Sequence, residues 1–212
     1  MENCGTKTAE YLLQIKAIKL QPSNPFTWAS GWKSPIYCDN RKTLSFPEVR
    51  SYIRDSFAAM VKEYYPDAEL IAGVATGAIA HGVLVAEKLG LPFIYVRSEA
   101  KEHGLGNQIE GYFEPGQKVV VIEDLISTGG SSLGAVKALR DSGCHLLGMT
   151  AIFTYEFKKA ADGFATAECE LHTLSNYSTL ISAAVESGYI SKQDVETLKQ
   201  WRVDPANWGV NR

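Results

Sequence analysis

Two adjacent carboxylates followed by a hydroxyl-rich turn carry the clearest chemical signal in this chain. Glu123 and Asp124 come directly after four β-branched apolar residues at 119–122, and residues 127–132 read Ser-Thr-Gly-Gly-Ser-Ser. The apolar run predicts a strand that is buried on both faces. The backbone N–H groups of a small-residue turn that opens a helix can bind a phosphate. Together, the acidic pair and the turn predict a ligand that joins a phosphate to vicinal hydroxyls, such as ribose 5-phosphate.

Other interpretations of this segment are open at this point. A strand, acidic residues, small residues and a helix form a common crossover in α/β proteins, and a lone Gly-Gly turn is weak evidence for a site. A Walker-type phosphate loop needs a Lys before its Ser or Thr, and the turn contains none. A dinucleotide fingerprint, Gly-x-Gly-x-x-Gly after the first strand, is also absent from the sequence.

A second segment, at residues 97–111, combines cations with glycines and lacks a sustained apolar period. Its potential cations are Arg97, Lys101 and His103, and they follow a predicted strand. The glycines would allow the segment to open and close as lids do. A basic lid suits a substrate with a diphosphate leaving group, because it can neutralise charge and exclude water together. The simpler alternative is a solvated β-hairpin whose charges have no function.

A third segment, at residues 26–41, joins aromatic rings to a cation in the string Ser-Gly-x-Lys-Ser-Pro-x-Tyr. The ring of Tyr37 could stack on a flat heterocycle, and Lys33 could meet a carboxylate or phosphate. Part of the segment is also expected to pack over the core as an aromatic hood.

The elements that must position these segments alternate along the chain. Strands are predicted at 70–72, 93–96, 118–122 and 146–153, and helices at 79–89 and 131–142. A capping box at 45–48 is expected to start an earlier helix. This order predicts an α/β fold with a central, mostly parallel sheet flanked by helices. Ligands of such sheets bind at the carboxyl ends of the strands, where the acidic pair lies.

The three segments together resemble one family of enzymes. The acidic pair with its Ser/Thr-Gly turn resembles the phosphoribosyl diphosphate (PRPP) signature of the type I phosphoribosyltransferases. The hood string and the lid string Arg-x-x-x-Lys-x-His-Gly-x-Gly-Asn, in this order and spacing, resemble those of the orotate phosphoribosyltransferase family. The likeness runs from about residue 26 to residue 153.

The resemblance implies a reaction and an architecture. The 5-phosphoribosyl group of PRPP would pass to orotate, giving orotidine 5′-phosphate and diphosphate in pyrimidine (UMP) biosynthesis. Mg²⁺ would be bound mainly through PRPP and diphosphate, with no protein residue as metal ligand. The fold would be a single type I phosphoribosyltransferase domain over residues 1–212, with a hood at about 1–45 plus C-terminal helices, a core at about 46–155 and a mobile lid loop at about 98–111. A phosphoribosyltransferase for another base and a PRPP-sensing regulator without turnover are the alternatives.

The resemblance also implies a role for each matching residue. Asp124, Lys101 and His103 would be catalytic, and Ser127, Lys33 and Tyr37 would bind orotate. The lid would reach into the active site of a second subunit, so a homodimer with shared sites is expected. The residues expected to bind PRPP are Arg97, Lys101, His103, Glu123, Asp124, Leu125, Ile126, Ser127, Thr128, Gly129, Gly130 and Ser131.

Three positions depart from the family pattern. Ser98 stands where many relatives have a Lys, and Gly77 stands where many have a Lys in the turn after the first sheet strand. Segment 154–157 lacks the Arg that meets the orotate carboxylate in some relatives. The carboxylate is therefore expected to be held by backbone N–H groups, by Lys33 or by Arg41.

Composition fits a cytoplasmic enzyme. The formal net charge of the 212 residues is −3, which gives no general attraction to nucleic acid or to an anionic membrane. No N-terminal signal pattern is seen, and no apolar run approaches the ~20 residues that span a bilayer. The cysteines have no metal-binding spacing and are expected to be reduced and mostly buried: Cys4, Cys38, Cys144 and Cys169.

Overall fold

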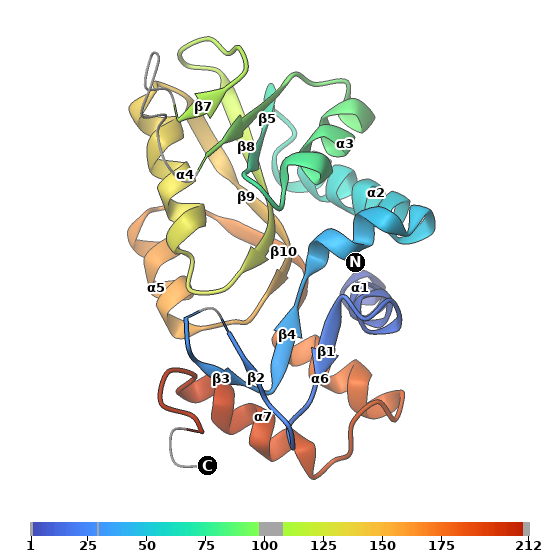
Figure 1. Ribbon diagram of the computed structural model, residues 1–212. Helices are drawn as coiled ribbons and strands as arrows, with labels where there is room; N and C mark the ends of the chain where they lie inside the picture. The colour runs from blue at the N-terminus through green and yellow to red at the C-terminus, as the bar shows by residue number, and fades with distance from the viewer. Residues whose placement is uncertain (1, 29, 98–107, 210–212) are drawn as a thin grey trace.

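A computed structural model describes residues 2–28, 30–97 and 108–209 and shows a central six-stranded sheet (Figure 1). The strand order is β10-β9-β8-β5-β6-β7, and every neighbouring pair is parallel except β6 with β7. The predicted mostly parallel sheet is therefore confirmed. The strands are β5 (Leu70–Val74), β6 (Phe93–Val96), β7 (Ile109–Glu110), β8 (Lys118–Ile126), β9 (His145–Thr154) and β10 (Leu171–Asn176).

Helices cover both faces of this sheet. α2 (Pro47–Tyr64) and α3 (Ile79–Leu89) lie on one face, and α4 (Gly130–Asp141) and α5 (Lys158–Thr166) lie on the other (Figure 1). Successive side chains of β8 alternate between the two layers: Val120 and Ile122 join one apolar cluster, and Val119 and Val121 join the other. All four side chains are fully buried, as their β-branched run predicts.

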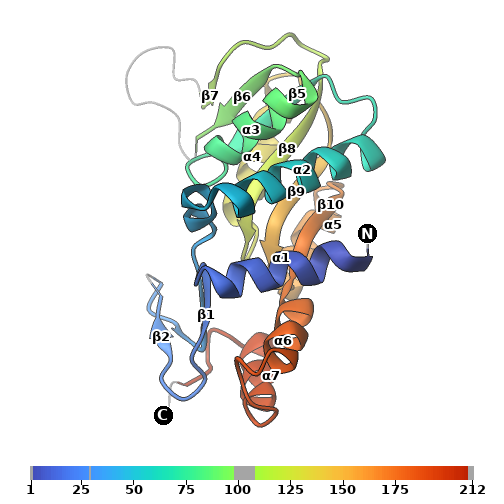
Figure 2. The same ribbon diagram turned by 90° about the vertical axis from the view of Figure 1, so that its right-hand side faces the viewer.

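The hood is built from both ends of the chain (Figure 2). Its N-terminal elements are α1 (Glu2–Gln14), β1 (Ile18–Leu20), β2 (Phe26–Thr27), β3 (Lys33–Ser34), β4 (Ile36–Cys38) and the 3₁₀ helix η1 (Asn40–Ser45). Its C-terminal elements are α6 (Tyr177–Glu186) and α7 (Asp194–Val203). The fully buried ring of Trp201 in α7 lies 5.6 Å from Trp28 and 5.7 Å from Tyr155, so one aromatic cluster joins the hood to the end of β9.

The structure differs from the sequence predictions at several element ends. The capping box is wrong: Ser45 belongs to η1, and α2 begins after Phe46 with Pro47 in its first turn and no side-chain cap. β8 continues through the acidic pair to Ile126, because its neighbour β9 also continues and pairs with it to Thr154. β10 adds a strand that was not predicted.

The cysteines are all free, as expected, but only Cys144 and Cys169 are buried, while Cys4 and Cys38 are half-buried. Among the helices that the structure describes, none is long and apolar enough to cross a membrane.

Candidate functional site

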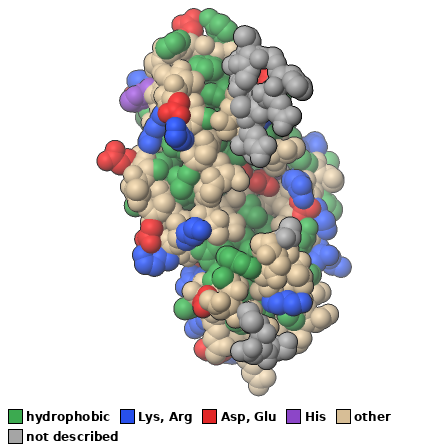
Figure 3. Space-filling view, turned by 60° about the vertical axis from the view of Figure 1, so that its left-hand side comes forward, with side chains coloured by type: hydrophobic (Ala, Val, Ile, Leu, Met, Phe, Trp, Pro, Cys, Tyr) green, Lys and Arg blue, Asp and Glu red, His purple; other side chains and the backbone are tan. Residues whose placement is uncertain are grey.

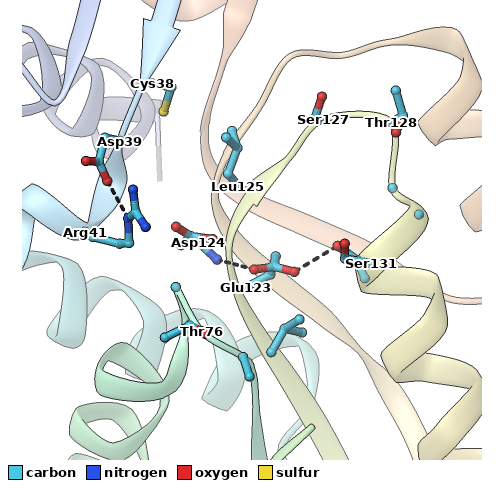
Figure 4. A pocket seen from close by; sticks show the side chains of 16 residues that line it. Cys38, Asp39, Arg41, Thr76, Glu123, Asp124, Leu125, Ser127, Thr128 and Ser131 are labelled. Carbon is cyan, nitrogen blue, oxygen red and sulfur yellow. Dashed lines mark hydrogen bonds and ion pairs between the residues drawn. The ribbon is translucent and has the colours of Figure 1, made fainter. Parts of the chain in front are cut away.

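A cavity of about 580 Å³ lies at the carboxyl ends of β5 and β8, where the hood meets the sheet (Figure 4). Its lining residues fall within three segments, 38–41, 74–77 and 123–132. The first belongs to the hood, the second is the end of β5 with its turn, and the third runs from β8 into α4. In the space-filling view, carboxylate atoms lie in a hollow of the surface and basic side chains border it (Figure 3).

The turn between β8 and α4 has the geometry of an anion site. Gly129 has a φ of 83°, in the left-handed region that favours glycine, and α4 begins at the next residue. Ser127, Thr128 and Ser131 line the cavity beside it. No acidic residue lies in the first turn of α4, so the N–H groups and the positive end of this helix are available to a phosphate.

The two carboxylates of the acidic pair have different surroundings. Glu123 is almost fully buried: its Oε1 accepts a hydrogen bond from the Asp124 N–H at 2.9 Å, and its Oε2 accepts one from Ser132 Oγ at 2.9 Å. Burial raises the pKa of Glu123, and the neighbouring charge of Asp124 raises it further. Burial also raises the pKa of Asp124, although Glu123 and the positive charge of Arg41 act in the opposite direction. The pair is therefore poised for hydroxyl donors or cations that would stabilise its charged form.

Asp124 is enclosed from two sides. A Cβ atom on Gly77 would overlap the Asp124 carboxylate, so the turn after β5 passes directly against this group. From the hood, Asn40 Nδ2 donates a hydrogen bond to the Asp124 backbone oxygen at 2.6 Å. The sequence interpretation assigned no role to Asn40, because this contact joins residues 84 positions apart.

Most residues that were predicted to bind PRPP come together in this cavity. Glu123, Asp124, Leu125 and residues 127–131 all line it. Ile126 is different: its side chain is fully buried in an apolar cluster on one face of the sheet, and it does not line the cavity.

Arg97 lies at the end of β6, outside the cavity lining, with its guanidinium 3.7 Å from Glu110. Its backbone N–H donates to the Gln108 carbonyl at 2.9 Å, which fixes the base of the predicted lid. Lys101 and His103 lie outside the described residues.

The predicted orotate-binding residues are divided. Ser127 lines the cavity, whereas Lys33 and Tyr37 do not. Lys33 Nζ donates to Thr27 Oγ1 at 2.8 Å, and the ring of Tyr37 packs 5.6 Å from that of Phe26. Both contacts hold the two side chains within the hood.

Arg41 is the only Lys or Arg among the lining residues in the part of the chain that the structure describes. Its Nε lies 2.7 Å from Asp39 Oδ1, and that carboxylate raises the pKa of Arg41 further. The lining residues Cys38 and Asp39 were not predicted to belong to the site, although both directly follow the hood string within segment 26–41.

A glycine- and hydroxyl-rich turn beside an acidic pair, at the carboxyl edge of a mostly parallel sheet, is typical of the phosphoribosyltransferases of type I fold. The family model for the phosphoribosyl transferase domain matches residues 44–173. An orotate phosphoribosyltransferase of Phocaeicola vulgatus is 60% identical over 204 residues, which cover 96% of each chain. One from Porphyromonas gingivalis is 57% identical over 210 residues, which cover 99% of this chain and all of the relative.

A solved structure agrees with these sequence matches. The orotate phosphoribosyltransferase of Aeropyrum pernix superposes with a TM-score of 0.75 at 26% identity, covering 86% of this chain and 99% of that one. The chain therefore belongs to the orotate phosphoribosyltransferase family, as its hood, lid and turn predicted.

Proposed function

We propose that this chain transfers the 5-phosphoribosyl group of PRPP to orotate, releasing diphosphate and forming orotidine 5′-phosphate for pyrimidine biosynthesis. The observation that carries the proposal is the single cavity that joins a phosphate turn, an acidic pair and the hood. Family membership supports the choice of orotate as the acceptor base.

In this proposal, the turn at 127–131 holds the 5-phosphate and the acidic pair holds the ribose hydroxyls. Both Glu123 oxygens already accept protein hydrogen bonds, and one of these comes from Ser132 in the first turn of α4. Glu123 therefore braces the phosphate turn against β8, while Asp124 presents its carboxylate to the cavity. Vicinal hydroxyls are suitable donors for this arrangement because ionised carboxylates only accept hydrogen bonds.

The reaction needs little proton transfer from the protein. The bond from the anomeric carbon to diphosphate breaks, the ribose ring gains oxocarbenium character, and the deprotonated ring nitrogen of orotate attacks from the opposite face. The protein aligns the two reactants, neutralises the leaving group and excludes water. Arg97 and the lid residues Lys101 and His103 are the proposed contacts of the diphosphate.

Mg²⁺ is the proposed cofactor, held mainly by substrate oxygens. In the described part of the chain, no group of three His, Cys, Asp or Glu side chains is arranged to hold a metal ion. The carboxylates of Asp124 and Asp39 do line the cavity, so oxygen donors suited to this hard cation are within reach. When bound, Mg²⁺ would supply positive charge to the diphosphate.

Arg41 is the residue that we favour for the orotate carboxylate. It lines the cavity, whereas Lys33 and Tyr37 do not: both residues are exposed, and each contacts another hood residue. Ser127 is the proposed hydroxyl contact to the base, since it lines the cavity at the start of the phosphate turn. Lys33 and Tyr37 keep their proposed roles only if the hood shifts when substrate binds.

A homodimer with shared sites and a cytoplasmic location complete the proposal. The lid string supports the shared sites, and the four free cysteines support a reducing compartment. Neither nucleic acid nor a membrane is a proposed partner.

The proposal is tested by following orotate absorbance with PRPP and Mg²⁺. Loss of orotate that needs all three components is the expected result. Turnover of a purine base instead would indicate a different acceptor, and PRPP binding without turnover of any base would indicate a regulator.

Asp124→Asn is the matched active-site variant. The amide keeps the shape of the carboxylate but replaces one acceptor oxygen with a donor, so PRPP binding and turnover should both fall. Calorimetric titration with PRPP and Mg²⁺ measures the binding. Unchanged affinity together with unchanged activity would contradict the role of Asp124.

A further inference from the structure

Asn40 is a buried amide from the hood that reaches the strand carrying the acidic pair. Only 1% of its surface is exposed, and its Nδ2 donates to the Asp124 backbone oxygen at 2.6 Å. The described register pairs β5 with β8 only as far as Gly73 with Ile122, so Asp124 lies on the part of β8 that runs past this neighbour. A hood side chain therefore supplies the hydrogen bond to this backbone group.

The amide of Asn40 is itself held in place by a short relay. Cys38 Sγ donates to Asn40 Oδ1 at 3.2 Å, and Thr43 Oγ1 donates to the Asn40 backbone oxygen at 2.6 Å. Thr43 Oγ1 also lies 3.1 Å from His81 Nε2. Because the Thr43 hydroxyl has one proton and gives it to Asn40, His81 must donate through Nε2–H. The relay thus connects η1 with α3 on one side and with β8 on the other.

The opposite side of Asp124 is closed by Gly77, where any Cβ atom would overlap its carboxylate. The backbone of Asp124 is therefore fixed by the hood, and its carboxylate is confined by the turn after β5. Neither Asn40 nor Gly77, which impose these two constraints, is a residue that we place in contact with substrate.

We infer that Asn40 is a positioning residue, which fixes the Asp124 carboxylate for the ribose hydroxyls. Through Asn40, the position of that carboxylate depends on how the hood packs against the sheet. The inference rests on the proposed function but is tested separately from it. Small displacements matter at such a site, since a shift of about 1 Å can cost on the order of 10² in rate.

The informative variant is Asn40→Asp, which conserves shape and removes the donor. The new carboxylate would face the Asp124 carbonyl oxygen, so we expect kcat/KM for PRPP at pH 8.5 to fall on the order of 10²-fold. Titratable or charged groups around this position are Cys38, Asp39, Arg41, His81 and Asp124. Burial and the nearby carboxylates should raise the pKa of the new carboxyl group.

This gives a readout that a merely structural residue would not produce. Once protonated, the new carboxyl group has an O–H that can donate to the Asp124 carbonyl. The activity of Asn40→Asp relative to the parent should therefore recover as the pH is lowered from 8.5 to 6. The control is Asn24→Asp, the same substitution at an exposed hood position, which should match the parent at every pH.

Thr43→Val separates positioning from stability. It removes the relay hydroxyl but keeps the Asn40 amide, so it should lower the melting temperature with a smaller loss of kcat/KM than Asn40→Asp; Thr43→Ser should restore both. If Asn40→Asp stays within about threefold of the parent, a value far below that expectation, the inference is wrong. The inference is also wrong if the activity of Asn40→Asp shows no recovery at low pH. A loss of kcat/KM in Asn40→Asp and Thr43→Val that simply follows their melting temperatures would contradict it as well.

The proposed function can fail independently of this inference. Failure of the parent chain to consume orotate would contradict the function. In that case, calorimetry measures the dissociation constant of PRPP with Mg²⁺ for the parent and for Asn40→Asp. The positioning role predicts weaker binding by Asn40→Asp at pH 8.5 and recovery toward the parent at pH 6.

Discussion

Gly77 and Asp124 form the tightest contact of the site at the scale of single residues. We expect Gly77→Ala to fold but to lose activity, because the added methyl group would displace the Asp124 carboxylate. A displacement of about 1 Å corresponds to a loss on the order of 10² in kcat/KM. Steady-state kinetics with PRPP as the varied substrate measure this effect.

Gly134→Ala provides the matched control. Gly134 lies within α4, and a Cβ atom there would meet nothing within 4 Å. Since Ala is favoured over Gly inside a helix by roughly 0.5–1 kcal/mol, this variant should be slightly more stable and equally active. Equal activity of Gly77→Ala and Gly134→Ala would show that the close approach to Asp124 has no catalytic consequence.

The residue scale also shows which site residues could be predicted from the sequence. Glu123, Asp124 and the turn at 127–131 are contiguous, so their chemistry is visible in one string. Asn40 and Gly77 reach Asp124 only through the tertiary fold, and neither carries a local signal of that contact. Lys33 and Tyr37 were assigned from their residue types and by resemblance, and the cavity instead contains their neighbours Cys38, Asp39 and Arg41.

At the scale of elements, local pattern predicted the elements with long apolar runs and extended chain near β2 and β4, but it missed the hood strands β1 and β3. The strands β5, β6, β8 and β9 were predicted because their side chains are mostly buried and β-branched or apolar. The hood strands have two or three residues each and pair with distant partners, as Ile18 does with Cys38. β10 was missed because it is rich in polar residues and lies at the edge of the sheet, beyond β9.

The contact between η1 and α3 should make stability depend on pH. Burial lowers the pKa of His81 to about 4, from an ordinary value near 6.5. As the pH falls, the unfolded chain therefore binds a proton at His81 at a higher pH than the folded chain does. The contribution of neutral His81 to the free energy of unfolding is present above pH 6.5 and is lost as the pH falls toward 4. The loss amounts to about 2 kcal/mol between pH 7 and pH 5.

Urea denaturation of the parent and His81→Gln at these two pH values measures this contribution. The variant lacks the titrating group, so its free energy of unfolding should fall by about 2 kcal/mol less than that of the parent. The raised pKa of Glu123 acts in the opposite direction, with stability lost as the pH rises, but it is common to both proteins and cancels. Identical pH dependence in the two proteins would mean that His81 is not held neutral.

The C-terminal helices depend on the aromatic cluster around Trp201. The Trp201 ring is fully buried and lies 5.4 Å from Phe157 and 5.7 Å from Tyr177. Trp201→Ala should lower the free energy of unfolding by about 3–5 kcal/mol because it leaves a large cavity. Trp201→Phe should cost less, since it keeps a ring and removes an indole N–H that has no hydrogen-bond partner among the described residues. Similar losses for both substitutions, measured by denaturant titration, would contradict the packing argument.

At the scale of the whole molecule, the cavity is built from the hood, the sheet and the turn at 127–131. The proposed lid residues must reach it either from the same subunit or from a partner subunit. If Lys101 acts in the site of a partner subunit, two defective proteins can complement each other. A hybrid dimer of Lys101→Ala with Asp124→Asn would contain one site with both defects and one site with neither. With random exchange in a closed twofold dimer, half of the dimers are hybrids, so roughly a quarter of all sites become competent.

The measurement is orotate turnover after the two variants are mixed, with subunit exchange verified by mass spectrometry. Recovery toward a quarter of parent activity is expected, because only a crossing lid places an intact Lys101 and an intact Asp124 in the same site. A mixture of Lys101→Ala with Gly77→Ala is the parallel case, since Gly77 also lies on the cavity side that holds Asp124. Activity that stays at the level of the unmixed variants would place each lid over its own subunit and leave the proposed reaction intact.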